Sequence, residues 1–388
     1  MGRYVKQVWD SFRKGDMILL LLCLLLTAFG TLIIASTKNA VGFGRYVPIQ
    51  IISTFIGIGA YAVVSSIDAE YLSEQRRALT IFNVCLLLLL IPFGTDNDTG
   101  NRSWLDFPFL PIDIQPAEIC KITYILILAS VMNSHQNKPS HFLSVGHMAV
   151  HLIILLGLNM VLSRDLGVSL IFVFIFAGMA LSGGVSLLWF AGVFGALVVS
   201  FPVWWRFLGT YQQNRILILF DDTIDPLGIK ERYHSIRALK SLTGGGFTGQ
   251  GLFEGTRTQT EGALFAQHTD FIFAAVGEEL GFVGCMAILI MLVLIITRCV
   301  WVGIRSTDYM RKLICFGAAS ALIFQVCINV GMCLGVAPVI GLTLPFVSYG
   351  GSSLVTLYAM MGLVSGVYAR PTATSRERYI RPPLNYQY

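Results

Sequence analysis

The stretch from Met17 to Ser36, MILLLLCLLLTAFGTLIIAS, contains no charged side chain. It is long enough to cross the hydrocarbon core of a bilayer, which takes about 20 apolar residues in a helix. Basic residues precede it (Arg3, Lys6, Arg13 and Lys14), as they precede the apolar core of a signal peptide. The run is longer than such a core, and no small-residue cleavage pattern follows it. We therefore predict a retained first transmembrane helix.

Nine further apolar runs follow along the chain. They begin near Val47, Ala78, Glu118, Val145, Gly167, Val185, Phe271, Leu313 and Pro345. Of the 388 residues, 55% are hydrophobic and 13% are charged, about half the usual charged share of a globular protein. This composition excludes a soluble enzyme, a disordered chain and a nucleic-acid-binding module. The predicted fold is an all-α polytopic membrane protein with about ten transmembrane helices.

The distribution of Lys and Arg predicts the orientation of these helices, because cytoplasmic loops carry an excess of both. With the N-terminus inside, short outer loops hold only Lys38, Arg45, Arg102 and Arg164, and most other basic residues fall inside. Both termini are thus predicted to be cytoplasmic. Residues 1–370 form one transmembrane domain, with a large extracytoplasmic loop (206–270) between helices 7 and 8. Residues 371–388 are polar and are predicted to be a disordered cytoplasmic tail.

The eight Cys residues form no C-x-x-C pair and lie almost entirely in apolar stretches. This pattern favours small buried hydrophobic side chains over disulfides or zinc ligands.

Few charged residues fall within the predicted spans, and each such residue is a candidate for function because burying it in lipid is costly. Glu118 and Lys121 open the fourth span three residues apart, on one helix face where they can pair. An interfacial salt bridge that anchors the helix end is the alternative to a functional pair. Arg164 and Asp165 lie between the fifth and sixth runs, where a hydrated turn is the alternative to a site.

The densest group of polar residues is His268-Thr269-Asp270, at the start of the eighth span, followed by Glu278 and Glu279. Glu278 comes eight residues after Asp270 and is predicted to lie about two turns, or roughly 12 Å, along nearly the same helix face. Capping of the helix by Thr269 or Asp270 is the simpler interpretation of the first three residues. Capping does not explain two carboxylates in an otherwise apolar helix. Residues 274–284 also hold a stripe of small side chains that would let a neighbouring helix pack closely.

Two glycine-rich passages complete the set of candidate features. Residues 243–251, TGGGFTGQG, lack the G-K-[ST] ending of a phosphate-binding Walker loop. They are either a flexible turn or a backbone anion site. Residues 345–353, PFVSYGGSS, open the last span and include Ser348. They suggest a broken or capped helix that lines a cavity, with ordinary helix packing as the alternative.

Six motifs in order resemble the SEDS family (shape, elongation, division and sporulation; the RodA, FtsW and SpoVE proteins). The motifs are QPAEICK (115–121), DLG (165–167), DPLG (225–228) with the glycine run, HTDFIF (268–273), GEELG (277–281) and LPFVSYGGSS (344–353). The resemblance covers residues 16–370. Asn214-Arg215 and residues 255–259 are most similar to the RodA elongation branch.

The resemblance implies a peptidoglycan glycosyltransferase that polymerises lipid II at the outer face of the cytoplasmic membrane, for cell shape and elongation. It implies a class B penicillin-binding protein, a transpeptidase, as partner. The essential Asp of the family matches Asp270. Further residues that the resemblance implicates match Arg102, Trp104, Glu118, Lys121, Asp165 and Glu278, and the same motifs include His268 and Ser348.

Such a reaction needs a base for the attacking sugar hydroxyl, and Asp270 is the candidate. A single displacement inverts the donor's anomeric centre. The charge of the departing pyrophosphate must be met by cations: Arg102, Lys121, Arg215 and Lys240 are candidates, and a divalent ion (Mg²⁺ or Mn²⁺) is the alternative. Asp165 and Glu278 could coordinate a metal ion or orient the cavity.

Three rival interpretations remain open. The chain could be a transporter, a flippase for the same lipid-linked precursor. It could be a scaffold that only recruits a transpeptidase, or a member of the division or sporulation branch. No inverted repeat of the kind that many transporters carry is visible.

Overall fold

A computed structural model describes residues 12–37, 46–68, 75–95, 102–106, 113–206, 232–260 and 262–370, together with a few isolated residues between these ranges. The tail at 371–388, predicted to be disordered, lies outside the described residues, and so does Arg215.

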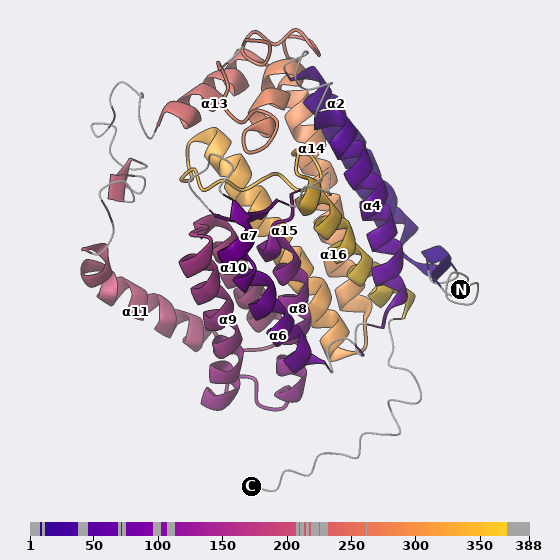
Figure 1. The fold of residues 1–388 in the computed structure, drawn as a ribbon, viewed down its shortest axis with the longest axis vertical. Coiled ribbons are helices and arrows are strands. Elements are labelled where there is room, and N and C mark those ends of the chain that lie inside the picture. Colours follow the sequence, from indigo (N-terminus) through magenta and orange to yellow (C-terminus); the bar gives the residue numbers. More distant parts are fainter. Residues whose placement is uncertain are drawn as a thin grey trace, which may run out of the picture.

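The described chain is almost wholly helical (Figure 1). A single two-stranded antiparallel hairpin, β1 (Gly94–Thr95) with β2 (Trp104–Leu105), is the described sheet. The described helices are α2 (Met17–Ser36), α4 (Val47–Ser66), α6 (Arg76–Leu88), α7 (Leu90–Phe93), α8 (Pro116–Ser134), α9 (Phe142–Leu162), α10 (Leu166–Ser182), α11 (Leu187–Trp205), α13 (Tyr233–Gly244), α14 (Ile272–Arg305), α15 (Tyr309–Leu334) and α16 (Gly351–Ala369).

Eight described helices are long and apolar enough to cross a membrane, counting Arg76–Phe93 as one, and two shorter apolar helices, Leu166–Ser182 and Leu187–Val203, match two further predicted runs. The all-α polytopic fold is thus confirmed, while the count of ten spans stays a prediction. Most helices begin within a few residues of the predicted points. The last begins later than expected, at Gly351 instead of Pro345, because the chain before it makes an irregular segment (335–350).

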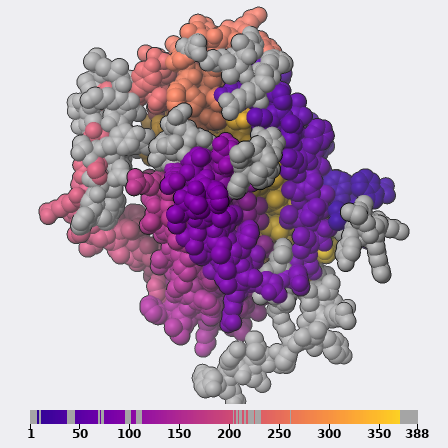
Figure 2. Space-filling view, in the orientation of Figure 1, coloured from indigo at the N-terminus to yellow at the C-terminus, as the bar shows by residue number. Residues whose placement is uncertain are grey.

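The bundle is organised around α16, whose side chains are mostly buried and which packs chiefly on α4. In the space-filling view, α16 shows only in narrow strips between the indigo and purple N-terminal helices (Figure 2). The helices α14 and α15 pack on each other, and α10 packs on α15. In contrast, α11 extends away from the body (Figure 1), and its apolar side chains are exposed over most of its length.

Two contact sets mark opposite ends of the bundle. At one end, Asp16 pairs with Arg298 at 2.7 Å, and its backbone N–H donates to the Ser365 hydroxyl. At the other end, the Ser36 hydroxyl donates to the Glu279 carboxylate. The start of α2 and the end of α16 therefore lie at the same end, as expected for termini on one side of a membrane. Six of the eight Cys are buried and all eight are free, while Cys85 and Cys327 are exposed.

The helix α14 is broken at Gly281, which has φ +64° and ψ −160°. Residues 243–251, the glycine run, provide hydrogen-bond partners for the backbone groups that the break leaves without helical partners. Gln250 N–H and Gly251 N–H donate to the carbonyls of Glu278 and Glu279, and the N–H groups of Phe282 and Val283 donate to the glycine run in return. Since these groups are engaged with α14, the run is a packed turn and not the flexible one considered above.

Close packing explains why this turn is rich in glycine. A Cβ on Gly245 would lie 1.8 Å from the carbonyl oxygen of Gly277, and one on Gly249 would lie 2.1 Å from that of Glu279. The small-residue stripe of α14 is thus covered at Gly277 and Gly281 by α13 and the glycine run. The prediction that a neighbouring helix packs closely on the stripe holds for α13, which belongs to the long segment at 206–270.

Two glycines of this turn provide a matched test of that packing. Both Gly246 (φ +56°) and Gly249 (φ +85°) are left-handed, but a Cβ on Gly246 meets nothing within 4 Å. Gly246→Ala should therefore cost only the backbone strain, about 1–2 kcal/mol. Gly249→Ala should cost about 1–3 kcal/mol more from overpacking. Thermal unfolding in detergent should give a clearly lower Tm for Gly249→Ala, and equal Tm values would contradict the docked turn.

Candidate active site

Asp270 lies in the turn that precedes α14, at the end of the bundle opposite the Asp16–Arg298 pair. No described residue donates a hydrogen bond to its carboxylate, and the residue as a whole is half-buried. A Cβ on Gly341 would lie 3.7 Å from Asp270 Oδ2. Loss of hydration, followed by the charge of Asp165, raises the pKa of Asp270 to about 6. A carboxylate in this state is ionised at neutral pH and accepts a proton more readily than an ordinary Asp.

The backbone of Asp270, unlike its carboxylate, is held firmly. The Asn329 side chain on α15 is fully buried, and its Nδ2 donates to the carbonyl of Asp270 at 2.8 Å and to that of Leu342 at 2.6 Å. Sequence reasoning missed Asn329. The available signal was a neutral amide in the middle of an apolar helix, which is uncommon in a membrane span and often marks an interhelical hydrogen bond.

Asp165 caps α10, because its Oδ1 accepts from Val168 N–H at 3.1 Å. Its other oxygen accepts from Gln115 Nε2 at 3.1 Å. Burial is the main cause of its raised pKa, and the nearby charge of Glu118 adds to the shift. The turn at Arg164–Asp165 is therefore more than a hydrated connection, because it places a carboxylate within electrostatic reach of Asp270.

The predicted pair between Glu118 and Lys121 is confirmed. Lys121 Nζ lies 2.7 Å from Glu118 Oε2, both side chains are buried, and the Thr356 hydroxyl donates to the same oxygen. Both charges act on the pKa of Asp165: Glu118 raises it and Lys121 lowers it. Four predicted site residues, from the starts of α8, α10 and α14, thus gather at one end of the bundle: Glu118, Lys121, Asp165 and Asp270.

Glu278 lies apart from this group. It is fully buried, and its Oε1 accepts from Arg257 N–H in the segment between α13 and α14. Its neighbour Glu279 accepts from the Thr258 hydroxyl at 2.8 Å. The prediction that Asp270 lies on the same helix face as Glu278 was wrong, because α14 begins only at Ile272 and Phe271 is its N-cap. Phe271 makes no side-chain capping bond, so the capping role suggested for Thr269 or Asp270 is also wrong.

His268 and Ser348 hold the turn around Asp270. The Ser348 hydroxyl donates to the carbonyl of Thr269 at 2.7 Å and accepts from Leu344 N–H. The ring of His268 stacks on the ring of Tyr46, with the two ring centroids 4.3 Å apart. The backbone carbonyl of His268 accepts from Tyr349 N–H. Residues 345–350 are therefore packed against the Asp270 turn before the last helix begins.

Arg102 and Trp104 lie in the hairpin between α7 and α8. Arg102 is exposed, and its Nε donates to the carbonyl of Gly94 at 2.8 Å. Trp104 is half-buried on β2. Between them, Ser103 is buried and lies 3.5 Å from the carbonyl of Ser163, so the hairpin contacts the turn that carries Asp165.

The remaining candidates for charge or metal binding are not gathered with these residues. Lys240 is exposed on α13, and within the described residues its ammonium forms no ion pair with Asp270 or Asp165. Within the described ranges, no three His, Cys, Asp or Glu side chains group as metal ligands. Asp165 caps α10 by accepting from Val168 N–H, and Glu278 accepts from the backbone N–H of Arg257.

Comparison with known proteins gives one consistent result. The profile of the FtsW, RodA and SpoVE family, described as "Cell cycle protein", matches residues 16–372. The chain is 32% identical to the peptidoglycan glycosyltransferase MrdB of Escherichia coli, over 96% of this chain and 98% of that one. It is 30% identical to a probable peptidoglycan glycosyltransferase FtsW of Geobacter metallireducens, over 94% and 97% of the two chains.

Solved structures share the fold. A chain from a peptidoglycan synthase complex, described as coordinating polymerization and crosslinking, superposes with a TM-score of 0.77 at 28% identity, covering 95% of this chain and 99% of that one. The rod shape determining protein RodA of Thermus thermophilus gives a TM-score of 0.67 at 24% identity, covering 95% and 98%.

The buried pair of Glu118 and Lys121 can be tested by a double-mutant cycle. Lys121→Met should destabilise the protein by about 3–5 kcal/mol because it leaves Glu118 charged and uncompensated. Adding Glu118→Gln should recover much of that loss. Thermal unfolding in detergent measures the coupling, and Lys138→Met, which removes an exposed lysine, serves as the control. Strictly additive effects would contradict the pairing.

Proposed function

The chain belongs to the FtsW, RodA and SpoVE family of cell cycle proteins, and from this premise we propose that it is a peptidoglycan glycosyltransferase that polymerises lipid II. Its similarity to proteins of that name runs over nearly the whole chain. The observation that carries the proposal is the Asp270 carboxylate, which is fixed through its backbone, free of described donors and raised in pKa. These are the properties that a general base needs.

In the proposed reaction, the 4-hydroxyl of an acceptor GlcNAc attacks the anomeric carbon of a donor sugar. As the new C–O bond forms, the hydroxyl proton passes to Asp270. The bond from the anomeric carbon to the pyrophosphate oxygen breaks, and its electron pair leaves with the polyprenyl pyrophosphate. A single displacement inverts the anomeric centre and gives the β-1,4 linkage. One carboxylate is enough, because the leaving group needs no proton.

The neighbouring residues support that role. Asp165 makes Asp270 more basic through its negative charge. The Glu118–Lys121 pair and Gln115 hold Asp165 and the start of α8 in place. Asn329 and Ser348 position the Asp270 turn through backbone contacts. We assign to Arg102 and Trp104 a contact with the sugar or its carrier, because their hairpin touches the turn that carries Asp165.

We propose that the site faces outward. Asp270 lies at the end of the bundle opposite Asp16 and Arg298, and the loops at the Asp16 end carry most of the basic residues. By the distribution of positive charge, that end is cytoplasmic. The protein itself is a multi-pass membrane protein.

A class B penicillin-binding protein is the proposed partner, and a role in cell elongation is the proposed context. The support for a partner is the likeness to a chain from a complex that coordinates polymerization and crosslinking. The support for elongation is the higher identity to MrdB than to FtsW. A divalent ion, Mg²⁺ or Mn²⁺, is the alternative to protein cations at the pyrophosphate, and polymerisation measured in EDTA distinguishes the two.

Replacing the proposed base tests the assignment. Asp270→Asn keeps the shape of the side chain but cannot accept the proton, so polymerisation of lipid II should fall by at least about 10²–10⁴-fold. The product is measured as glycan chains formed by purified protein in detergent. Asp106→Asn, which changes an exposed carboxylate in the hairpin region, should retain activity. Full activity of folded Asp270→Asn protein would contradict the assignment of Asp270 as the general base.

The pH profile tests the electrostatic part of the proposal. Because the base must be ionised, kcat/KM should fall tenfold per unit as the pH drops below about 6. Asp165→Asn should move this acid limb to lower pH, since it removes the negative neighbour while Asn can still cap α10. An acid limb that stays in place in Asp165→Asn would show that the two carboxylates do not interact.

A further inference from the structure

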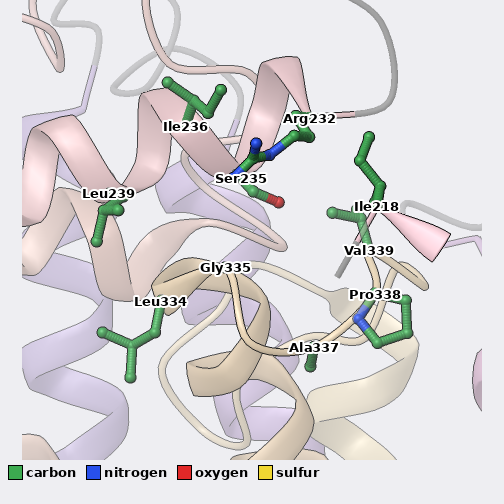
Figure 3. Close-up of a pocket in the computed structure, with 10 residues that line it drawn as sticks. All are labelled: Ile218, Arg232, Ser235, Ile236, Leu239, Leu334, Gly335, Ala337, Pro338 and Val339. Carbon is green, nitrogen blue, oxygen red and sulfur yellow. The ribbon is translucent and has the colours of Figure 1, made fainter. Parts of the chain in front are cut away.

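A pocket of about 110 Å³ lies between α13 and the segment that follows α15 (Figure 3). That volume holds several water molecules, enough for a group the size of a phosphate. The lining residues are Ile218, Arg232, Ser235, Ile236, Leu239, Leu334, Gly335, Ala337, Pro338 and Val339. None of them was a candidate from the sequence.

The polar lining comes from one side of the pocket. Arg232 and Ser235, three residues apart at the start of α13, both face the pocket (Figure 3). The buried Asp225 carboxylate accepts from Arg232 N–H at 3.2 Å, a contact that fixes the start of the helix. A guanidinium with a hydroxyl beside it is a typical setting for a phosphate oxygen.

The rest of the lining is apolar, and the edge of the pocket exposes apolar side chains. Leu239 is 40% exposed, Leu334 is 44% exposed, and Val336, adjacent to the lining, is 72% exposed. A ligand that fits this combination carries an anionic group on a hydrocarbon chain. A free sugar or a free inorganic anion would leave the apolar edge uncovered.

The pocket lies close to the proposed base. Val339 lines it, and Gly341 is two residues further along, so their Cα atoms are at most about 7 Å apart. The Cβ position of Gly341 in turn lies 3.7 Å from Asp270 Oδ2. One short segment therefore lines the pocket and passes beside the carboxylate.

The other described candidates for the pyrophosphate, Arg102, Lys121 and Lys240, do not line this pocket. We propose that the Arg232–Ser235 pocket binds the pyrophosphate of the polyprenyl-linked substrate, with the first part of its hydrocarbon chain on the apolar edge. This inference rests on the proposed function and assigns the leaving-group site within it.

The test combines polymerisation kinetics with inhibition by farnesyl pyrophosphate, a short polyprenyl pyrophosphate. Arg232→Gln should raise the KM for lipid II and the inhibition constant of farnesyl pyrophosphate about tenfold or more, with kcat changed much less. Arg232→Lys should restore part of the affinity, and Ser235→Ala should weaken it severalfold. Arg206→Gln, which removes an exposed arginine at the end of α11, should match the wild type. Unchanged constants in both Arg232→Gln and Ser235→Ala would overturn the proposal.

Three further probes separate the possible sources of the anionic group. Farnesol and inorganic pyrophosphate should each inhibit far more weakly than farnesyl pyrophosphate, because each lacks half of the ligand. Nanodiscs rich in phosphatidylglycerol should not compete with farnesyl pyrophosphate, and equal competition would assign the pocket to bulk anionic lipid and overturn the proposal.

Direct binding of farnesyl pyrophosphate, measured by calorimetry, keeps this test apart from the test of function. If wild-type protein makes no polymer but binds the probe in an Arg232-dependent way, the proposed enzyme activity fails and the pocket stands. If wild-type protein makes polymer but Arg232→Gln binds farnesyl pyrophosphate equally well, the proposed binding pocket is wrong and the proposed enzyme activity is supported.

Discussion

Buried backbone polar groups must find hydrogen-bond partners inside the protein, and this constraint holds the turn that carries Asp270. The amide of Asn329 serves two carbonyls at once, those of Asp270 and Leu342. Leaving buried carbonyls unpaired costs about 1–3 kcal/mol each. The turn before α14 and the segment before α16 are therefore tied to each other through one side chain of α15. The Ser348 hydroxyl adds a second tie to the same turn.

Because the backbone of Asp270 is held in this way, its carboxylate can be left without a donor. Hydrogen bonds to a carboxylate stabilise its charged form and lower its pKa, and they would make it a weaker base. At Asp270, loss of hydration and the charge of Asp165 both favour the protonated form, so its pKa is raised. Two other carboxylates at this end of the bundle have clear partners: Glu118 pairs with Lys121, and Glu279 accepts several donors. The geometry thus distinguishes the Asp270 carboxylate, which has no described donor, from these two paired carboxylates.

The sequence predicted the helices well, because uncharged runs such as Met17–Ser36 have few alternatives in a bilayer. It also predicted the Glu118–Lys121 pair, which depends only on helical spacing. It could not predict that Asp165 acts on Asp270, since these residues are far apart along the chain and meet only through packing. It failed at Glu278, because the helix starts after Asp270 and the glycine run covers the break at Gly281. Asn329 and Arg232 were missed because a single neutral amide or a loop arginine carries no local pattern.

The central claim is that Asp270 removes the proton from the attacking hydroxyl, and chemical rescue tests it most directly. Asp270→Ala protein should be inactive with lipid II in detergent. Added formate, a small carboxylate that can occupy the vacated space, should restore polymerisation in proportion to its concentration, while chloride at the same ionic strength should not. Polymerisation by Asp270→Ala at the wild-type rate without formate would contradict the account.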